Sequence, residues 1–177
     1  MAMHGMEYAR RVQARRGQLY RLAYCYVKNQ QDALDIVSEA VYRGLLRLHQ
    51  LRKGDSFDAW MNRIVVNAAL DHLRKGSTRW ESREELPPEL PAEEQTLTPE
   101  ETMDLYGALD FLPPEERTYL ILRFFEECSY REMAEILELP ESTIKSRLYR
   151  ILEKLRRQLT TGEEGHHGAS SRATAIL

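Results

Sequence analysis

A proline at position 140 separates two stretches of helical periodicity, and this break constrains the fold of the chain more than any other feature. Before the break, Ser129 stands three residues ahead of Glu132, which is the spacing of a capping box at a helix start. Proline has no backbone donor and disfavours helical geometry in the residue before it, so the first helix should end before Pro140. A second helix should start at Ser142 or Thr143. The sequence therefore predicts two helices joined by a turn of a few residues.

The second of these helices has one apolar face and one basic face. Apolar residues recur every three or four positions at Ile144, Leu148, Ile151, Leu152, Leu155 and Leu159. The other face carries, near its amino end, Thr143, Lys145, Ser146, Arg147, Tyr149 and Arg150. A recognition helix meets base edges in the major groove at this end, and these side-chain types can bind phosphates or guanine acceptors. The pattern indicates a helix-turn-helix that binds duplex DNA.

Two observations keep a simpler interpretation open. Two amphipathic helices with a solvated basic face would show the same periodicity without binding DNA. In addition, Glu138 occupies the position where many such turns have glycine for a left-handed backbone, which leaves open how this turn is built.

Charge is distributed unevenly along the 177 residues, although the net charge is only −3. Residues 1–79 hold 14 basic and 7 acidic side chains, whereas residues 80–116 hold 12 acidic side chains and one basic. Clustered glutamates with prolines at 87, 88 and 91 resist packing into a core. We therefore expect two compact basic domains on either side of an acidic, proline-containing linker.

The amino-terminal half is expected to contain three helices. Leu19, Leu22, Ala23 and Tyr26 would form the inner face of the first, after a basic patch. The second keeps apolar spacing at Ala33, Ile36, Val37, Ala40, Val41, Gly44, Leu45 and Leu48. The third begins near Ser56 and buries Trp60 with its apolar neighbours. The fold class is thus all-α, with a three-helix bundle at 1–76, a linker at 77–98, a helix-turn-helix domain at 99–160 and a disordered tail at 161–177.

Several functional classes are disfavoured by the sequence. No apolar run approaches the roughly 20 residues that cross a bilayer, so we expect a cytoplasmic protein with no membrane insertion of its own. Cys25 and Cys128 lack the spacing of a metal site, and we interpret both as packing residues. No nucleotide-binding or hydrolase motif is present. We expect no enzyme activity, no cofactor and no metal.

Several runs in order resemble one protein family. LYRLAYCYVKNQQDALDIVSEAVYRGLLRL and FDAWMNRIVVNAALDHLRK, then LPPEERTYLILRFFEECSYREMAEILELPESTIKSRLYR, are similar to bacterial RNA polymerase sigma factors of the extracytoplasmic-function (ECF) group. The resemblance covers about residues 8–159. It implies a minimal sigma-70 family factor with regions 2 and 4 that directs promoter recognition and transcription initiation. Implied partners are core RNA polymerase, through the clamp of its largest subunit and the flap of its second-largest, promoter DNA, and an anti-sigma factor that could hold the protein at the membrane.

The resemblance also implies roles for individual residues. Core polymerase would bind Asp32, Asp35, Glu39 and Arg43. The minus-ten element would be read as unpaired strand by His49, Gln50, Leu51, Arg52, Lys53, Arg63, Asn67 and Arg74, the basic ones contacting phosphates. The minus-thirty-five duplex would be read by Thr143, Lys145, Ser146, Arg147, Tyr149 and Arg150. Two alternatives remain: a sigma-like decoy that sequesters an anti-sigma factor, and a stand-alone helix-turn-helix regulator.

Overall fold

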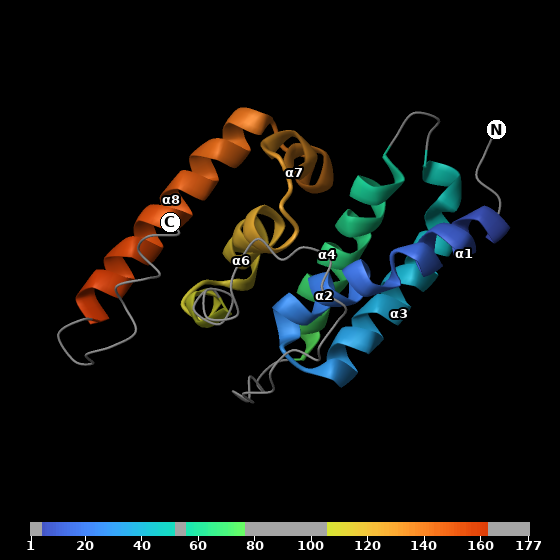
Figure 1. The fold of residues 1–177 in the computed structure, drawn as a ribbon, viewed down its shortest axis with the longest axis horizontal. Coiled ribbons are helices and arrows are strands. Elements are labelled where there is room, and N and C mark those ends of the chain that lie inside the picture. The colour runs from blue at the N-terminus through green and yellow to red at the C-terminus, as the bar shows by residue number, and fades with distance from the viewer. Residues whose placement is uncertain (1–4, 52–55, 77–105, 163–177) are drawn as a thin grey trace.

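The structure, a computed structural model, describes residues 5–51, 56–76 and 106–162, and the regular elements within these ranges are all helical (Figure 1). Side chains are described up to residue 158. The predicted linker at 77–98, Arg52 and Lys53, and all but the first two residues of the predicted tail lie outside the described residues. None of the described helices is long and apolar enough to cross a bilayer.

The amino-terminal half contains one helix more than predicted. Its elements are α1 (Gly5–Ala14), α2 (Arg16–Val27), α3 (Gln30–Arg47), the 3-10 turn η1 (Leu48–Gln50) and α4 (Phe57–Lys75). The predicted basic patch lies on α1 and at its junction with α2, where the backbone leaves helical geometry at Arg15. Only Tyr8 of α1 is fully buried, and its hydroxyl donates to the Val41 carbonyl at 2.7 Å. Because Tyr8 is the only fully buried residue of α1, no apolar stripe marks this helix in the sequence.

Gly44 makes room for that anchor. A Cβ added at this position would overlap the hydroxyl oxygen of Tyr8. Overpacking of this kind is expected to cost about 1–3 kcal/mol, so Gly44→Ala should lower the free energy of unfolding by that amount in urea titrations. Tyr8→Phe in the same chain should recover part of the loss, because it removes the overlapping oxygen. Equal stability of Gly44→Ala and the parent chain would show that α1 is not docked on α3.

Capping side chains start α3 and α4, and a shared core holds them. Asn29 accepts from the Asp32 backbone N–H before α3, and Ser56 accepts from the Ala59 N–H before α4, which confirms the predicted start of that helix. Trp60 is only 6% exposed and Met61 fully buried, so the prediction that Trp60 is a core residue is confirmed. Leu45, predicted to be in the core, is instead 50% exposed, because the buried face of α3 follows Ala33, Ile36, Ala40 and Gly44.

The helix-turn-helix follows the prediction closely. It consists of α7 (Tyr130–Leu137) and α8 (Glu141–Gly162). Both hydrogen bonds of the Ser129–Glu132 capping box are present. The turn is closed by Glu138 in a left-handed conformation at φ 54°, with its N–H donating to the Ala134 carbonyl. The second helix starts at Glu141, slightly earlier than predicted, because the Pro140 carbonyl accepts the N–H groups of Thr143 and Ile144.

The two halves share one buried core rather than standing apart. In the carboxyl-terminal half, three short elements precede α7 along the chain. They are a helical turn at residues 106–109, α6 (Pro114–Leu120) and the π-helix η2 (Ile121–Phe125). Helices α6 and α7 lie against α4 (Figure 1). The Tyr26 hydroxyl of α2 donates to Thr118 of α6 at 2.8 Å, in a fully buried contact between segments 92 residues apart.

Candidate nucleic-acid interface

The amino-terminal turns of α8 present the predicted basic face to solvent. Lys145, Ser146, Tyr149 and Arg150 are exposed, with Tyr149 at 69%. Lys145 pairs with Glu141 at 2.8 Å and lies over the Tyr130 ring, and the Ser146 hydroxyl donates to the Thr143 carbonyl. These local contacts hold the side chains along the helix while leaving their polar ends at the surface. The face therefore has the chemistry and the access that base and phosphate contacts require.

Arg147 differs from its neighbours on this face. Its guanidinium donates to the Tyr119 hydroxyl of α6 at 3.0 Å, so it ties α8 to the rest of its own half. Arg147 also lines a cleft of about 220 Å³ between α4, α6 and the turn after α7. Arg63 and Asn67 of α4 line the same cleft. Residues predicted to bind two different promoter elements thus lie around one cleft.

The described residues of the predicted minus-ten surface lie in two environments. His49, Gln50 and Asn67 are exposed, and Leu51 is half-buried. Arg63 makes an ion pair with Glu138 of the helix-turn-helix turn, and Arg74 reaches Glu115 of α6 at 3.5 Å. The two predicted phosphate-binding arginines of α4 are therefore engaged with the carboxyl-terminal half of the chain.

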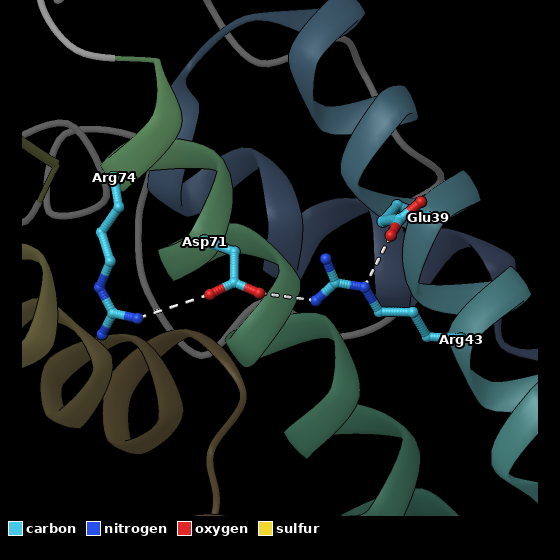
Figure 2. A network of polar contacts seen from close by, with 4 residues as sticks. All are labelled: Glu39, Arg43, Asp71 and Arg74. Atoms are coloured by element: carbon cyan, nitrogen blue, oxygen red, sulfur yellow. Dashed lines mark hydrogen bonds and ion pairs between the residues drawn. The ribbon is translucent and has the colours of Figure 1, made fainter.

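An ion-pair network joins α3 to α4 (Figure 2). Arg43 donates to Glu39 and to Asp71, both at 2.7 Å, and Arg74 approaches the other oxygen of Asp71 at 3.5 Å. The hydrogen bond that Arg43 donates to Asp71, followed by the one it donates to Glu39, raises the pKa of Arg43. Arg43 was predicted to bind the polymerase, and the structure gives it a half-buried position that braces two helices.

The other acidic residues of the predicted docking surface are more accessible, although not alike. Asp32 is half-buried: it accepts a hydrogen bond from the Asn29 amide at 2.8 Å and lies 3.6 Å from His72. Asp35 and Glu39 are exposed. Large apolar side chains surround them at Leu34, Tyr42, Leu45 and Leu46, between 36% and 59% exposed. This exposed apolar surface was not predicted, although its helical spacing, on the side of α3 opposite Ile36 and Ala40, could have revealed it.

Comparison with known proteins identifies the family. The family model for Sigma-70 region 2 matches residues 11–79, and that for Sigma-70 region 4 matches residues 102–155. The chain is 40% identical over 141 residues to the RNA polymerase sigma factor SigV of Bacillus subtilis, across 80% of this chain and 84% of that protein. The chain belongs to the ECF group of sigma-70 factors. As a sigma factor it directs promoter recognition by RNA polymerase and is not itself an enzyme.

A second sequence relative and one solved structure extend the comparison. It is 36% identical over 146 residues to the ECF sigma factor SigE of Mycolicibacterium smegmatis, across 78% of this chain but 56% of that longer protein. The fold is similar to that of the sigma factor RpoE of Bartonella quintana, solved in complex with the anti-sigma factor NepR. In that case the TM-score is 0.63 at 22% identity, over 87% of this chain and 97% of the other. This last comparison supports the fold alone.

Region 4 of the sigma factor contains an ionisable group, Glu126, that should make stability depend on pH. Burial raises the pKa of Glu126, which follows η2, to about 7, although Arg21 and Arg15 act in the opposite direction. The nearby thiols Cys25 and Cys128, whose pKa burial raises to about 12, stay neutral throughout this range. The folded chain therefore holds a proton that the unfolded chain releases near pH 4.5.

This proton predicts the direction of a stability change. As pH rises from 4.5 to about 7, the free energy of unfolding should fall, and above that range it should level off. Glu126→Gln keeps the side chain neutral, so the variant should exceed the parent by about 1–3 kcal/mol at pH 8 and match it at pH 4.5. Urea titrations at the two pH values measure this difference. The same gap at both values would contradict a raised pKa for the half-buried Glu126.

Proposed function

We propose that the two halves of this sigma factor divide promoter recognition between them. Residues 1–76 dock on core polymerase and read the minus-ten element, residues 99–160 read the minus-thirty-five element, and residues 77–98 link them, with residues 161–177 as a tail. The observation that carries this division is that the exposed basic face of α8 and the exposed acidic and apolar face of α3 lie on different halves. One surface suits nucleic acid, and the other suits a protein.

The docking surface on α3 consists of Asp35 and Glu39 with the exposed Leu34, Tyr42 and Leu45. A protein interface needs an apolar centre with polar groups at its rim, and this face has both. The clamp of the largest polymerase subunit is its partner, and the flap of the second-largest subunit binds residues 99–160. Asp32 contributes at the edge of this surface, while Arg43 holds α3 in place against α4.

Region 4 recognises duplex DNA, and region 2 recognises a single strand. Lys145, Ser146, Tyr149 and Arg150 read duplex edges or phosphates, with Thr143 and Arg147 at the border of that face. The segment His49 to Lys53 and Asn67 take an unpaired base, which must leave its stack before its pairing edge can be read. Arg63 and Arg74 position the strand through phosphates. Binding both states of DNA at once shifts the promoter towards the melted form.

An anti-sigma factor is the remaining proposed partner. The sigma factor RpoE of Bartonella quintana, which shares this fold, was solved with the anti-sigma factor NepR. We propose that this chain likewise binds an anti-sigma factor. The sigma factor would work in the cytoplasm, where the anti-sigma factor can hold it inactive, in some cases at the membrane.

A selection of random duplex DNA, carried out with and without core RNA polymerase, tests the proposal. The full chain should enrich sequences with two separated elements only when core is present. A palindromic site enriched by the chain alone would favour a stand-alone regulator. No enrichment under either condition, with a folded chain and active core, would favour a decoy that only captures an anti-sigma factor.

A further inference from the structure

Helix α1 and its junction with α2 carry a basic surface to which the proposed function gives no role. Residues 5–16 hold four arginines and one glutamate. Arg10, Arg11 and Arg16 are exposed, and among the residues that the structure describes Arg10 and Arg16 have no ion-pair partner. We call these three arginines the α1 basic surface. Like charges gathered without counter-charges favour a negatively charged partner.

This surface is fixed on region 2 by buried contacts. The Tyr8 hydroxyl donates to the Val41 carbonyl at 2.7 Å, and the Tyr8 ring packs edge-on against Phe57 with 6.1 Å between the ring centroids. At the junction with α2, Arg15 makes an ion pair with Asp58 of α4 at 2.8 Å, and its side chain is only 16% exposed. Arg15 therefore braces the junction, while the other three arginines remain accessible to a partner.

The α1 basic surface lies next to the proposed minus-ten surface. The Arg11 guanidinium lies 5.5 Å from the centroid of the Phe57 ring. Phe57 is the first residue of α4, and the segment His49 to Lys53, which we propose takes an unpaired base, ends four residues before it. Figure 1 shows α1 at the end of region 2 where α3 ends and α4 begins. The nucleic acid that can reach both surfaces is therefore the unpaired strand.

We propose that the α1 basic surface binds phosphates of the unpaired promoter strand, beside the base held by the segment His49 to Lys53. Guanidinium groups match phosphate oxygens with paired hydrogen bonds, and such contacts position a strand without reading its sequence. The inference rests on the proposed function only for the place along the strand at which the contact is made. Binding of a single strand by α1 can be measured without polymerase or promoter.

The first test measures binding of a fluorescein-labelled oligodeoxythymidylate to the full-length chain by fluorescence anisotropy at several salt concentrations. Each phosphate contact to a single strand contributes about 0.7 to the slope of log affinity against log salt. Arg10→Gln with Arg16→Gln should therefore reduce the magnitude of this slope by about 1.4. At about 0.1 M salt, the same counterion release predicts an affinity about 25-fold lower than that of the parent chain.

Lys75→Gln with Arg157→Gln is the matched control, because it removes the same charge from two exposed side chains elsewhere. Lys75 ends α4 about 27 Å along the helix from Phe57, and Arg157 lies in α8. The control should keep the slope and the affinity of the parent chain. The proposal would be overturned by an equal loss in the control, by parent-like binding of the variant at Arg10 and Arg16, or by a parent chain that does not bind the oligonucleotide at low salt.

Glu7 allows a test in the opposite direction. Its carboxylate accepts a hydrogen bond from Arg11 at 2.9 Å and so competes with a phosphate for that guanidinium. Glu7→Gln should tighten oligodeoxythymidylate binding by about two- to fivefold, because Arg11 can then make one more phosphate contact. Glu135→Gln removes a similar ion pair with Arg131 within α7 and should leave the affinity unchanged. Unchanged or weaker binding after Glu7→Gln would overturn the role of Arg11.

The place along the strand has its own readout. Ethylation interference on promoter DNA bound by the core–sigma complex identifies the phosphates that binding requires. Interference beside the minus-ten element should be present with the parent chain and lost with the variant at Arg10 and Arg16. Weaker binding of this variant to core without DNA would assign the surface to the polymerase and overturn the proposal. If the parent complex selected no promoter, the proposed function would fail, and the oligodeoxythymidylate result would still stand.

Discussion

Lys145→Ala with Arg150→Ala is expected to reduce transcription from the cognate promoter by at least a hundredfold. Both side chains lie on the exposed amino-terminal face of α8, where a recognition helix meets base edges. A bidentate base contact is worth about 1–3 kcal/mol, and a lysine on a phosphate contributes further through counterion release. The measurement is the affinity of the core–sigma complex for promoter duplex, taken at several salt concentrations.

The salt dependence separates the two roles. If Lys145 contacts a phosphate, its loss should lower the slope of log affinity against log salt by about one, whereas loss of a base-reading Arg150 should relax sequence preference. Arg157→Ala is the control, because it removes the same charge two turns further along the helix, where Arg157 lies 3.8 Å from Glu153. An equal loss in this control would mean that α8 contributes only general positive charge.

Asp35→Arg with Glu39→Arg is expected to weaken binding to core polymerase by at least tenfold. The two carboxylates are exposed one helical turn apart, and placing arginines there reverses the charge of the proposed docking face of α3. Like charges brought together across an interface cost several kcal/mol. Co-elution of full-length sigma factor with core on gel filtration, followed by titration, measures the effect.

A control variant distinguishes loss of the docking site from a general effect of added positive charge. Glu135→Arg with Glu153→Arg makes the same change in charge on α7 and α8, where both carboxylates otherwise pair with arginines in their own helices. This variant should co-elute normally with core. Normal co-elution of the α3 variant as well would move the docking site away from Asp35 and Glu39.

Local sequence signals predicted the helix-turn-helix well. The capping box at Ser129 and the stop at Pro140 depend on residues a few positions apart, so their effect on the backbone can be derived without the rest of the fold. The all-α class and the family were predicted from periodicity and motif order, and both are confirmed. The individual binding residues stay predictions, and the experiments above are designed to test them.

Features that depend on long-range contacts were not predictable in this way. Helix α1 is anchored by Tyr8 against Val41 and Gly44, which lie more than 30 residues away. The exposure of Leu45 depends on which face of α3 meets α4. Glu138 looked like a poor residue for the turn, and its ion pair with Arg63 on a distant helix supplies a reason that the local sequence could not.

Mapping transcript starts is the most direct test of the account as a whole. Core RNA polymerase should be incubated with sheared genomic DNA from the organism that encodes the chain, with and without the full-length sigma factor, and the run-off products sequenced. We expect discrete new starts that share two upstream elements. The distance between the two upstream elements should allow both DNA-reading halves of one chain to bind them together. The absence of new starts, with a folded chain and active core, would contradict this expectation.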